Sequence, residues 1–449
     1  MIPGWKLRRE LARVGTQIAN IPHSLAALPK RLTEPRRARA YDAAFPAALH
    51  QTVGTLQPNA RLSVLVLYQP GGVAGSTLAT CRWLAAAGVA PLVVSNAPLA
   101  DADRAALADT AWRVVERPNF GYDFGAYRDG IRLIRAEGLQ PERLLLMNDS
   151  VWCPMDADPL SALLTHAGDL VGIVQDEKVA HDRSGGRPTD RRHLESYCLS
   201  VSARLWRAPA FQAFWDGYRL TDYKPDTIRR GEIGLSRAME AAGFDLAALG
   251  TREMFLKAMA MQETVSLCEI LDHAAYDDHQ FAKENAVLLT RAGWPRAQGA
   301  REPRTVQATF DRQVPGEHEA ALQRRRPERT EPQMRTSEAT TSLWAESAKT
   351  GPHPTWMGSG DEAAWRADAL DHIRRWVNRR RYPVAFPLGN ARALGTFCLK
   401  KNSEPIFAAA RHSYLRAVAS GLIAPPPPPT LNEVTARTAT VSSRRDHGI

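Results

Sequence analysis

Short apolar runs alternate with amphipathic stretches between residues 60 and 180. The apolar runs have the length of strands, and the stretches between them repeat apolar residues at helical spacing. The predicted strands are Leu62–Tyr68, Pro91–Ser95, Trp112–Glu116, Leu144–Met147 and Leu170–Val174. The predicted helices are Thr77–Ala87, Ala102–Ala108, Tyr127–Ala136 and Leu160–His166. This alternation predicts an α/β fold, with a parallel or mixed sheet flanked by helices on both faces.

Residues 1–55 form a predicted N-terminal arm that includes an amphipathic helix. Apolar side chains recur there at spacings of three and four, and basic side chains lie on the other faces. The apolar positions are Leu7, Leu11, Val14, Ile18 and Ile21. Such a helix suits an anionic membrane surface, but it can also pack on the main domain with a solvated basic face. The periodicity leaves both alternatives open.

The rest of the chain divides by changes in composition. A stretch rich in Arg, Glu, Pro, Thr and Ser shows little periodicity, which indicates a disordered linker or insertion. Helical spacing returns after it at Glu362–Arg379 and Glu404–Ala419, and the run Pro425–Pro429 begins a polyproline-type, disordered tail. The predicted parts are a catalytic domain over 56–290, the linker over 291–360, a helical region over 361–423 and the tail over 424–449.

Charge and composition exclude several classes of protein. The net charge is +10, but residues 1–40 hold nine basic and two acidic side chains, so the body is close to neutral and nucleic acid is not an expected partner. The longest apolar run is far shorter than the roughly 20 residues that span a bilayer, and the first residues lack the pattern of a cleaved signal, so we do not expect secretion by that route. Five scattered cysteines without a CxxC pair indicate buried, reduced thiols. We therefore expect a cytoplasmic protein.

The loop after the strand Trp112–Glu116 contains Asn119-Phe120-Gly121-Tyr122-Asp123-Phe124-Gly125. Ligands of such sheets bind outside the carboxyl ends of the strands. The two glycines allow a close approach of the backbone or a positive φ, and Asn119 and Asp123 can bond ribose hydroxyls or a base edge. A tight turn with Asp123 as helix N-cap explains single members of this run. A ligand-binding loop explains the whole run better.

Asp149 follows the next predicted strand, in Asn148-Asp149-Ser150. A carboxylate at the end of a buried strand is costly to desolvate unless a cation meets it. Mg²⁺ or Mn²⁺ carrying a nucleotide diphosphate would meet it well. The nearby Asp156-Ala157-Asp158 has the spelling of a metal motif, but Asp158 precedes Pro159 as a helix N-cap would. We therefore predict Asp149 as the metal ligand.

Glu232 lies in Arg230-Gly231-Glu232-Ile233, at the start of a predicted helix that runs to Ala242. A carboxylate in the first turn of a helix can complement the helix dipole. The same carboxylate, aimed into a cleft, can act as a general base. The local sequence leaves both roles open.

Taken together, these segments resemble the rhamnan synthesis protein F family over about residues 60–250. The likeness rests on the first strand, the Asn119–Gly125 run, Asn148-Asp149-Ser150, Ser196-Tyr197 before a strand, and Gly231-Glu232 followed by Leu235-Ser236. The family consists of bacterial proteins of cell-surface polysaccharide assembly that are treated as glycosyltransferases. The resemblance implies a GT-A-like, Rossmann-like fold.

The resemblance also implies roles for individual residues. Asn119, Gly121 and Asp123 would help hold a nucleotide sugar, Asp149 would take the place of the metal- and diphosphate-binding carboxylate, and Glu232 would be the candidate base. The other predicted substrate-binding residues are Gly125, Asn148, Ser150, Ser196 and Tyr197. We expect an inverting transfer of rhamnose or another deoxyhexose from a nucleoside-diphosphate sugar. The acceptor would be a cell-surface polysaccharide or a lipid-linked glycan at the inner face of the bacterial inner membrane, where residues 1–40 could bind.

Two alternatives remain from the sequence. The first is a non-catalytic, nucleotide-sugar-binding scaffold of a polysaccharide-assembly complex, which the single carboxylate at Asn148-Asp149-Ser150 keeps open. The second is another Rossmann-like transferase, for example one that uses S-adenosylmethionine. The segment Tyr68-Gln69-Pro70-Gly71-Gly72 disfavours the second, because its glycines follow a proline and are in the wrong order for a dinucleotide-type turn.

Overall fold

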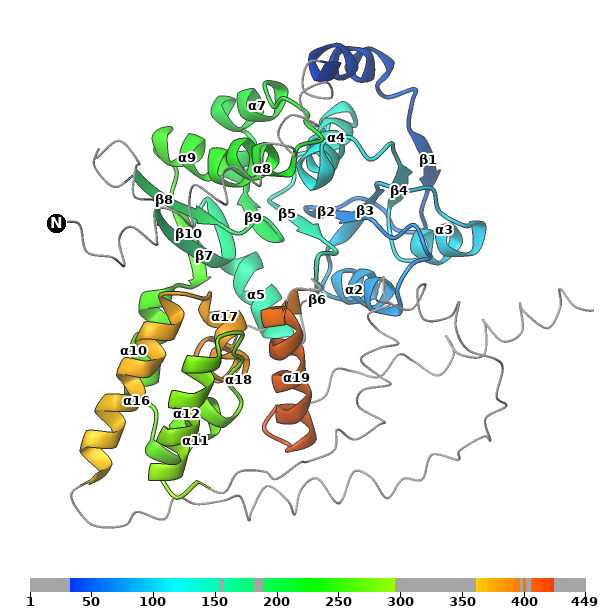
Figure 1. Cartoon of the computed structure of the whole chain (residues 1–449). Helices are drawn as coiled ribbons and strands as arrows, with labels where there is room; N and C mark the ends of the chain where they lie inside the picture. The colour runs from blue at the N-terminus through cyan, green and yellow to red at the C-terminus, as the bar shows by residue number, and fades with distance from the viewer. Residues whose placement is uncertain are drawn as a thin grey trace, which may run out of the picture.

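The computed structural model confirms an α/β fold, built on a mixed sheet of nine strands with helices on both faces (Figure 1). It describes residues 33–152, 157–180, 189–294, 361–395, 399–400 and 405–423. The predicted amphipathic stretch around Leu7–Ile21, most of the predicted linker and the predicted tail lie outside these residues. The finer, GT-A-like description stays a prediction.

The strand order of the main sheet is β1-β4-β3-β2-β5-β9-β7-β10, and β8 pairs with β7. β4, β3, β2 and β5 run parallel, and β9 is antiparallel to both β5 and β7. A separate two-stranded sheet joins β11 to β6. The strands are β1 (His50–Val53), β2 (Arg61–Leu67), β3 (Ala90–Ser95), β4 (Arg113–Glu116), β5 (Arg143–Asn148), β6 (Val151–Trp152), β7 (Leu170–Ala180), β8 (Thr189–Leu194), β9 (Cys198–Ser202), β10 (Leu246–Gly250) and β11 (Leu399–Lys400).

All five predicted strands are confirmed, and each begins within one residue of its predicted start. Their apolar runs are continuous because both faces of the central strands are buried under helices, as in β2, whose residues from Leu62 to Leu67 are all buried. The exception in length is β7, which continues six residues beyond the predicted end at Val174. Its extension is polar and pairs with β8 in an antiparallel ladder, so no apolar pattern marked it.

The helices before the predicted linker are α2 (Gly75–Ala86), α3 (Asp101–Ala108), α4 (Tyr122–Ala136), α5 (Ala157–Thr165), α6 (Ala203–Trp206), α7 (Pro209–Asp216), α8 (Lys224–Thr227), the π-helical turn η1 (Ile228–Glu232), α9 (Ile233–Ala241), α10 (Arg252–Met261), α11 (Thr264–Asp272) and α12 (His279–Arg291). After it come α16 (Asp361–Val377), α17 (Tyr382–Ala385), α18 (Pro387–Leu394) and α19 (Pro405–Ala419). α5 begins at Ala157, so Asp158 lies in its first turn rather than before it.

Each face of the sheet has its own apolar core. On one face, α4, α6, α7 and α9 bury aromatic side chains such as Tyr127, Phe211 and Trp215. On the other face, α2, α3 and α5 share a core with α10 to α12 and with α16 to α19 (Figure 1). Side chains of the sheet such as Met147 and Ile173 belong to the same cluster as Trp365 and Phe386. The helices of residues 361–423 are therefore packed onto the sheet rather than forming a separate core.

Part of the predicted N-terminal arm packs on the body. Residues 33–44 are helical, and β1 pairs with β4 at the edge of the sheet. Glu34 accepts hydrogen bonds from Thr221 and Asp222, and Arg37 forms an ion pair with Asp222 (2.7 Å). On the neighbouring turn, Asp42 pairs with arginines of α4.

Two further expectations can be compared with the described residues. Cys81, Cys198 and Cys268 are buried free thiols, as predicted, whereas Cys153 and Cys398 lie outside these residues. No described helix combines the length and the apolar character that crossing a membrane requires.

Candidate functional site

The candidate site lies where the winding of the chain along the sheet reverses. From β2 the chain proceeds to β3 and β4 on one side, and then α4 returns it to β5 on the other side of β2. Ligands of open α/β sheets bind in the crevice outside the carboxyl ends of the strands at this switch point. The loops after β2 and β5 therefore define where a ligand should be sought.

Asp149 follows β5 and connects these two loops. Its Oδ2 accepts hydrogen bonds from the backbone N–H of Tyr68 (3.1 Å) and from Nε2 of Gln69 (2.7 Å). Its own N–H donates to the carbonyl of Val66 (3.0 Å). No hydrogen bond from the described residues reaches Oδ1 of Asp149, so one carboxylate oxygen is held in place and the other can meet a ligand.

Asp123, in the first turn of α4, adds a second carboxyl group. Its Oδ2 accepts a hydrogen bond from Nδ2 of Asn148 (2.9 Å). Burial, followed by the negative charges of Asp149 and Glu232, raises the pKa of Asp123 to about 7, while Lys224 and the bond from Asn148 act in the opposite direction. The charges of Asp149 and Glu232 thus both act on Asp123, so the three carboxyl groups lie close enough to interact.

Glu232, the last residue of the π-helical turn η1, adds a third carboxyl group to this site. Its Oε1 accepts hydrogen bonds from the N–H (3.1 Å) and the Oγ (2.8 Å) of Ser196, and its Oε2 lies 3.9 Å from Nε2 of His193. The side chain is 19% exposed. Helical backbone already begins at Lys224 and passes through a π-helical turn, so Glu232 is not in a first turn. Glu232 is therefore not placed to complement a helix dipole. π-helical turns such as η1 are frequent at functional sites.

The turn that carries Ser196 and Tyr197 is tied to the same elements. The hydroxyl of Tyr127, on α4, donates to the carbonyl of Ser196 (2.9 Å), and the N–H of Asn148 donates to the carbonyl of Tyr197 (3.1 Å). Ser150 closes the loop after β5, because its Oγ and its N–H both donate to Oδ1 of Asn148. Hydrogen bonds therefore connect most of the predicted site residues, either directly or through one neighbouring residue.

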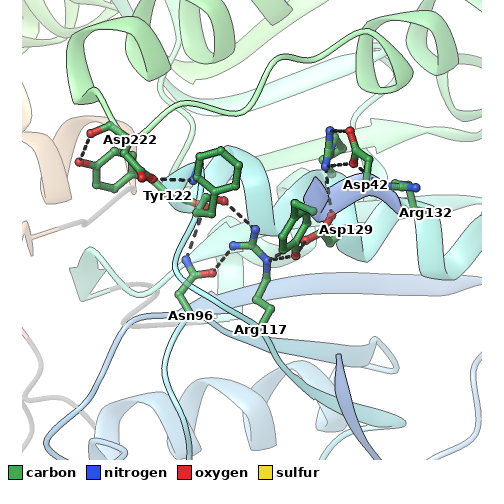
Figure 2. A network of polar contacts seen from close by, with 11 residues as sticks. Asp42, Asn96, Arg117, Tyr122, Asp129, Arg132 and Asp222 are labelled. Carbon is green, nitrogen blue, oxygen red and sulfur yellow. Dashed lines mark hydrogen bonds and ion pairs between the residues drawn. The ribbon is translucent and has the colours of Figure 1, made fainter. Parts of the chain in front are cut away.

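A buried ion pair shapes the loop that precedes α4 (Figure 2). The guanidinium of Arg117 donates to Asp129 (2.7 Å), to Oδ1 of Asn96 (2.6 Å) and to the carbonyl of Phe120 (2.6 Å). The side chains of Arg117 and Asp129 are both fully buried, and the hydroxyl of Tyr41 bonds to Asp129 as well. This network determines the path of the backbone from β4 into α4.

The structure gives the two glycines of the loop a packing explanation. Gly121 has a φ of +87°, and a Cβ there would lie 2.7 Å from Cδ2 of Leu220. A Cβ on Gly125 would lie 2.4 Å from the carbonyl oxygen of Phe120. Gly121, rather than Asp123, caps α4, which starts five residues before the predicted helix. Asn119 is exposed, and among the described residues it forms no hydrogen bond with the other predicted site residues.

The structure adds residues that the sequence patterns did not single out. Tyr68 is 51% exposed beside Asp149, Gln69 holds the carboxylate of Asp149, and the exposed Lys224 is the cation acting on Asp123. Tyr68 and Gln69 follow a strand and could have been found by the same strand-end argument as Asp149. Lys224 could not have been found in this way, because it comes close only through the packing of α8 against α4.

The donor set fits a divalent cation that arrives with a ligand. In the part of the chain that the structure describes, no three His, Cys, Asp or Glu side chains are grouped as metal ligands. Mg²⁺ needs no such cage, since it commonly takes one or two carboxylates and fills its other positions with water and substrate phosphates. Asp149, with Asp123 nearby, matches that requirement.

Comparisons with known proteins agree with the resemblance stated above. The model of the family described as rhamnan synthesis protein F matches residues 92–267, which run from β3 into α11. The chain is also similar to a protein of Sinorhizobium fredii strain NGR234 described as uncharacterized protein y4gN. The two are 30% identical over 287 residues, which cover 63% of this chain and 71% of that protein.

Proposed function

The chain belongs to the rhamnan synthesis protein F family, and from this premise we propose that it is a glycosyltransferase that uses a nucleoside-diphosphate sugar. The family description supports a part in the synthesis of rhamnan or a related polysaccharide. The observation that carries the proposal is the meeting of Asp123, Asp149 and Glu232 at the switch point of the sheet.

The diphosphate of the donor would bind near Asp149. Asp149 would hold Mg²⁺ or Mn²⁺, which would stabilise the negative charge that develops on the leaving diphosphate. Lys224 supplies a second positive charge beside Asp123. The exposed ring of Tyr68 offers a flat apolar surface next to this position, onto which a base or a sugar could stack.

Glu232 would act as the general base. The hydrogen bonds from Ser196 fix Oε1, so the carboxylate has a defined orientation before the acceptor arrives. Glu232 takes the proton of an acceptor hydroxyl, and the acceptor oxygen forms a bond to the anomeric carbon. The bond from that carbon to the diphosphate breaks on the opposite face, and the diphosphate leaves with the electron pair. A single displacement of this kind inverts the anomeric configuration.

Binding measurements with the purified chain test the proposal. A panel of nucleoside-diphosphate sugars would be titrated with and without Mg²⁺, into the unmodified chain and into Asp149→Asn. Asp109→Asn, on the exposed end of α3, is the matched control. We expect binding of at least one donor, strengthened by Mg²⁺, lost in Asp149→Asn and kept in the control. Binding without transfer to any glycan acceptor would favour the non-catalytic scaffold, and no binding at all would contradict both functions.

The donor and acceptor follow from the family rather than from the geometry. We propose rhamnose or another deoxyhexose as the donor sugar, and a lipid-linked glycan at the inner face of the inner membrane as the acceptor. The basic residues that precede the described part of the chain would bind the anionic lipid surface there.

Vesicle flotation tests this attachment. Deleting residues 1–32 should move the protein from the vesicle fraction to the free fraction, and raised salt should weaken binding of the full chain. The deletion ends at residue 32 because Glu34 and Arg37 hold the helical residues 33–44 to the body. Unchanged flotation would show that the arm does not bind the membrane.

A further inference from the structure

Arg381 brings the helical region 361–423 to the edge of the candidate site. It lies directly before α17, far along the chain from the other site residues. Its Nη2 donates to Oδ2 of Asp176 (2.8 Å), and its Nη1 donates to Oε1 of Glu195. Asp176 is on β7 and Glu195 follows β8, and both carboxylates are buried while the arginine is 29% exposed. One guanidinium therefore connects two strands of the sheet to α17.

Glu195 is the immediate neighbour of the residue that orients Glu232. The N–H of Glu195 donates to the carbonyl of Val174 (3.0 Å), and the next residue, Ser196, gives Glu232 both of its hydrogen bonds. The pair between Arg381 and Glu195 therefore lies one residue away from the group that holds Glu232. Substituting a residue that supports the neighbours of a catalytic group commonly changes activity, although that residue does not contact the substrate.

The electrostatics agree with this geometry. Burial lowers the pKa of Arg381, but the negative charges of Glu195, Asp176 and Glu232 raise it above its ordinary value overall. Glu232 is therefore close enough to sense the guanidinium. Removing Arg381 would leave two buried carboxylates without the cation that pairs with them, which favours rearrangement of the turn.

We propose that Arg381 is a positioning residue of the transfer site, which fixes the turn at Ser196 and thereby the orientation of Glu232. The inference rests on the proposed function of Glu232. It makes the helical region part of the reacting unit, although that region lies outside the segment matched by the family model.

Three variants test this role. Arg381→Gln removes the charge and the paired donors, and Arg381→Lys keeps the charge. Arg380→Gln is the matched control, because Arg380 is the adjacent residue and bonds both oxygens of Asp277 away from the site. We expect Arg381→Gln to lower kcat by about 10- to 100-fold with little change in donor KM, because misplacement of a base affects the reacting step. Arg381→Lys should recover part of kcat, and the control should be unchanged.

Hydrogen exchange of the free protein separates this inference from the proposed function. The amide of Ser196 should exchange faster in Arg381→Gln than in the unmodified chain, and at the original rate in Arg380→Gln. This measurement needs no substrate, so it decides the role of Arg381 in the turn even if no transfer is found, a result that would count against the proposed function. Unchanged exchange at Ser196, or a kcat equal to that of the control, would overturn the inference.

Discussion

The charged groups around Arg117 and those around Asp149 lie at the same edge of the sheet. In the first group opposite charges are paired, whereas in the second group negative charge predominates. Arg117 and Asp129 are fully buried, and the donors of the guanidinium are met by a carboxylate, an amide oxygen and a backbone carbonyl (Figure 2). Around Asp149, two further carboxyl groups gather, and because Lys224 offsets their charge only in part, the pKa of Asp123 rises to about 7.

The difference separates a structural role from a binding role. A buried ion pair whose partners are all present fixes the backbone, and removing one partner leaves a charge without compensation. Carboxylates that repel one another cost stability in the free protein, and they gain most when a cation or a donor of hydrogen bonds arrives. Mutations in the first group should therefore affect folding, and mutations in the second should affect ligand chemistry.

The largest effect is expected for Glu232→Gln. Glutamine keeps the shape of the side chain but cannot accept the proton of the acceptor, so transfer should fall by about 10²- to 10⁴-fold. Donor binding and the melting temperature should change little. Glu240→Gln, on the exposed side of α9, is the control. Full transfer activity in Glu232→Gln would remove this residue from the mechanism and weaken the comparison.

Arg117→Met should destabilise the fold by about 3–5 kcal/mol, because buried Asp129 would lose its nearest cation and keep only Arg128, 3.7 Å away. Urea unfolding measures the loss. The double variant Arg117→Met/Asp129→Leu should lose less, since the buried carboxylate is removed together with Arg117, and Arg128 keeps its pair with Asp42. If the single variant is as stable as the unmodified chain, the Arg117 network is not the structural member of the comparison.

Gly121→Ala should cost about 1–3 kcal/mol, because alanine would be placed at positive φ and its Cβ would press against Leu220. Gly138→Ala is the control, since Gly138 also has positive φ but open space around its Cβ position. Thermal unfolding of both variants separates the cost of the backbone from the cost of the contact. Equal losses would show that contact with Leu220 adds nothing.

The last prediction concerns the pH dependence of stability that Asp123 produces. In the folded chain the carboxyl group of Asp123 keeps its proton up to about pH 7, whereas in the unfolded chain it loses that proton near pH 3.8. The free energy of unfolding therefore falls as the pH rises between these two values. Asp123→Asn stays neutral and should melt above the unmodified chain at pH 8. The advantage should shrink below pH 7 and vanish near pH 4. An advantage that does not change with pH would contradict the raised pKa.

The sheet could be predicted from the sequence because its central strands are buried on both faces. Leu62 to Leu67 form one apolar run whose length alone distinguishes a strand from a helix. The polar end of β7 could not be predicted, since its partner β8 covers it by backbone pairing rather than by apolar contact. The start of α4 was missed because Gly121 in left-handed conformation, not a side-chain cap, begins it.

The candidate site was predictable only in part. Asp149 is distinctive in the sequence because it follows an apolar strand, and in the structure its neighbour Asn148 donates a hydrogen bond to Asp123. Packing alone explains Gly121 and Gly125, so their presence in the loop is not evidence for a ligand. Arg381 could not be distinguished from Arg380 by any local pattern. Its position depends on a contact between residues almost 200 places apart, which only the folded chain reveals.

Because Arg381 and β11 come late in the chain, their contacts with the sheet can form only late during translation. Every strand of the main sheet has been synthesised by Gly250, but Arg381 and the strand that pairs with β6 are translated much later. A nascent polypeptide can therefore assemble its central sheet while the glutamate at position 232 still lacks its final support. Catalytic competence would then arise only after residue 381 has been translated, and products that stop before it would lack that support.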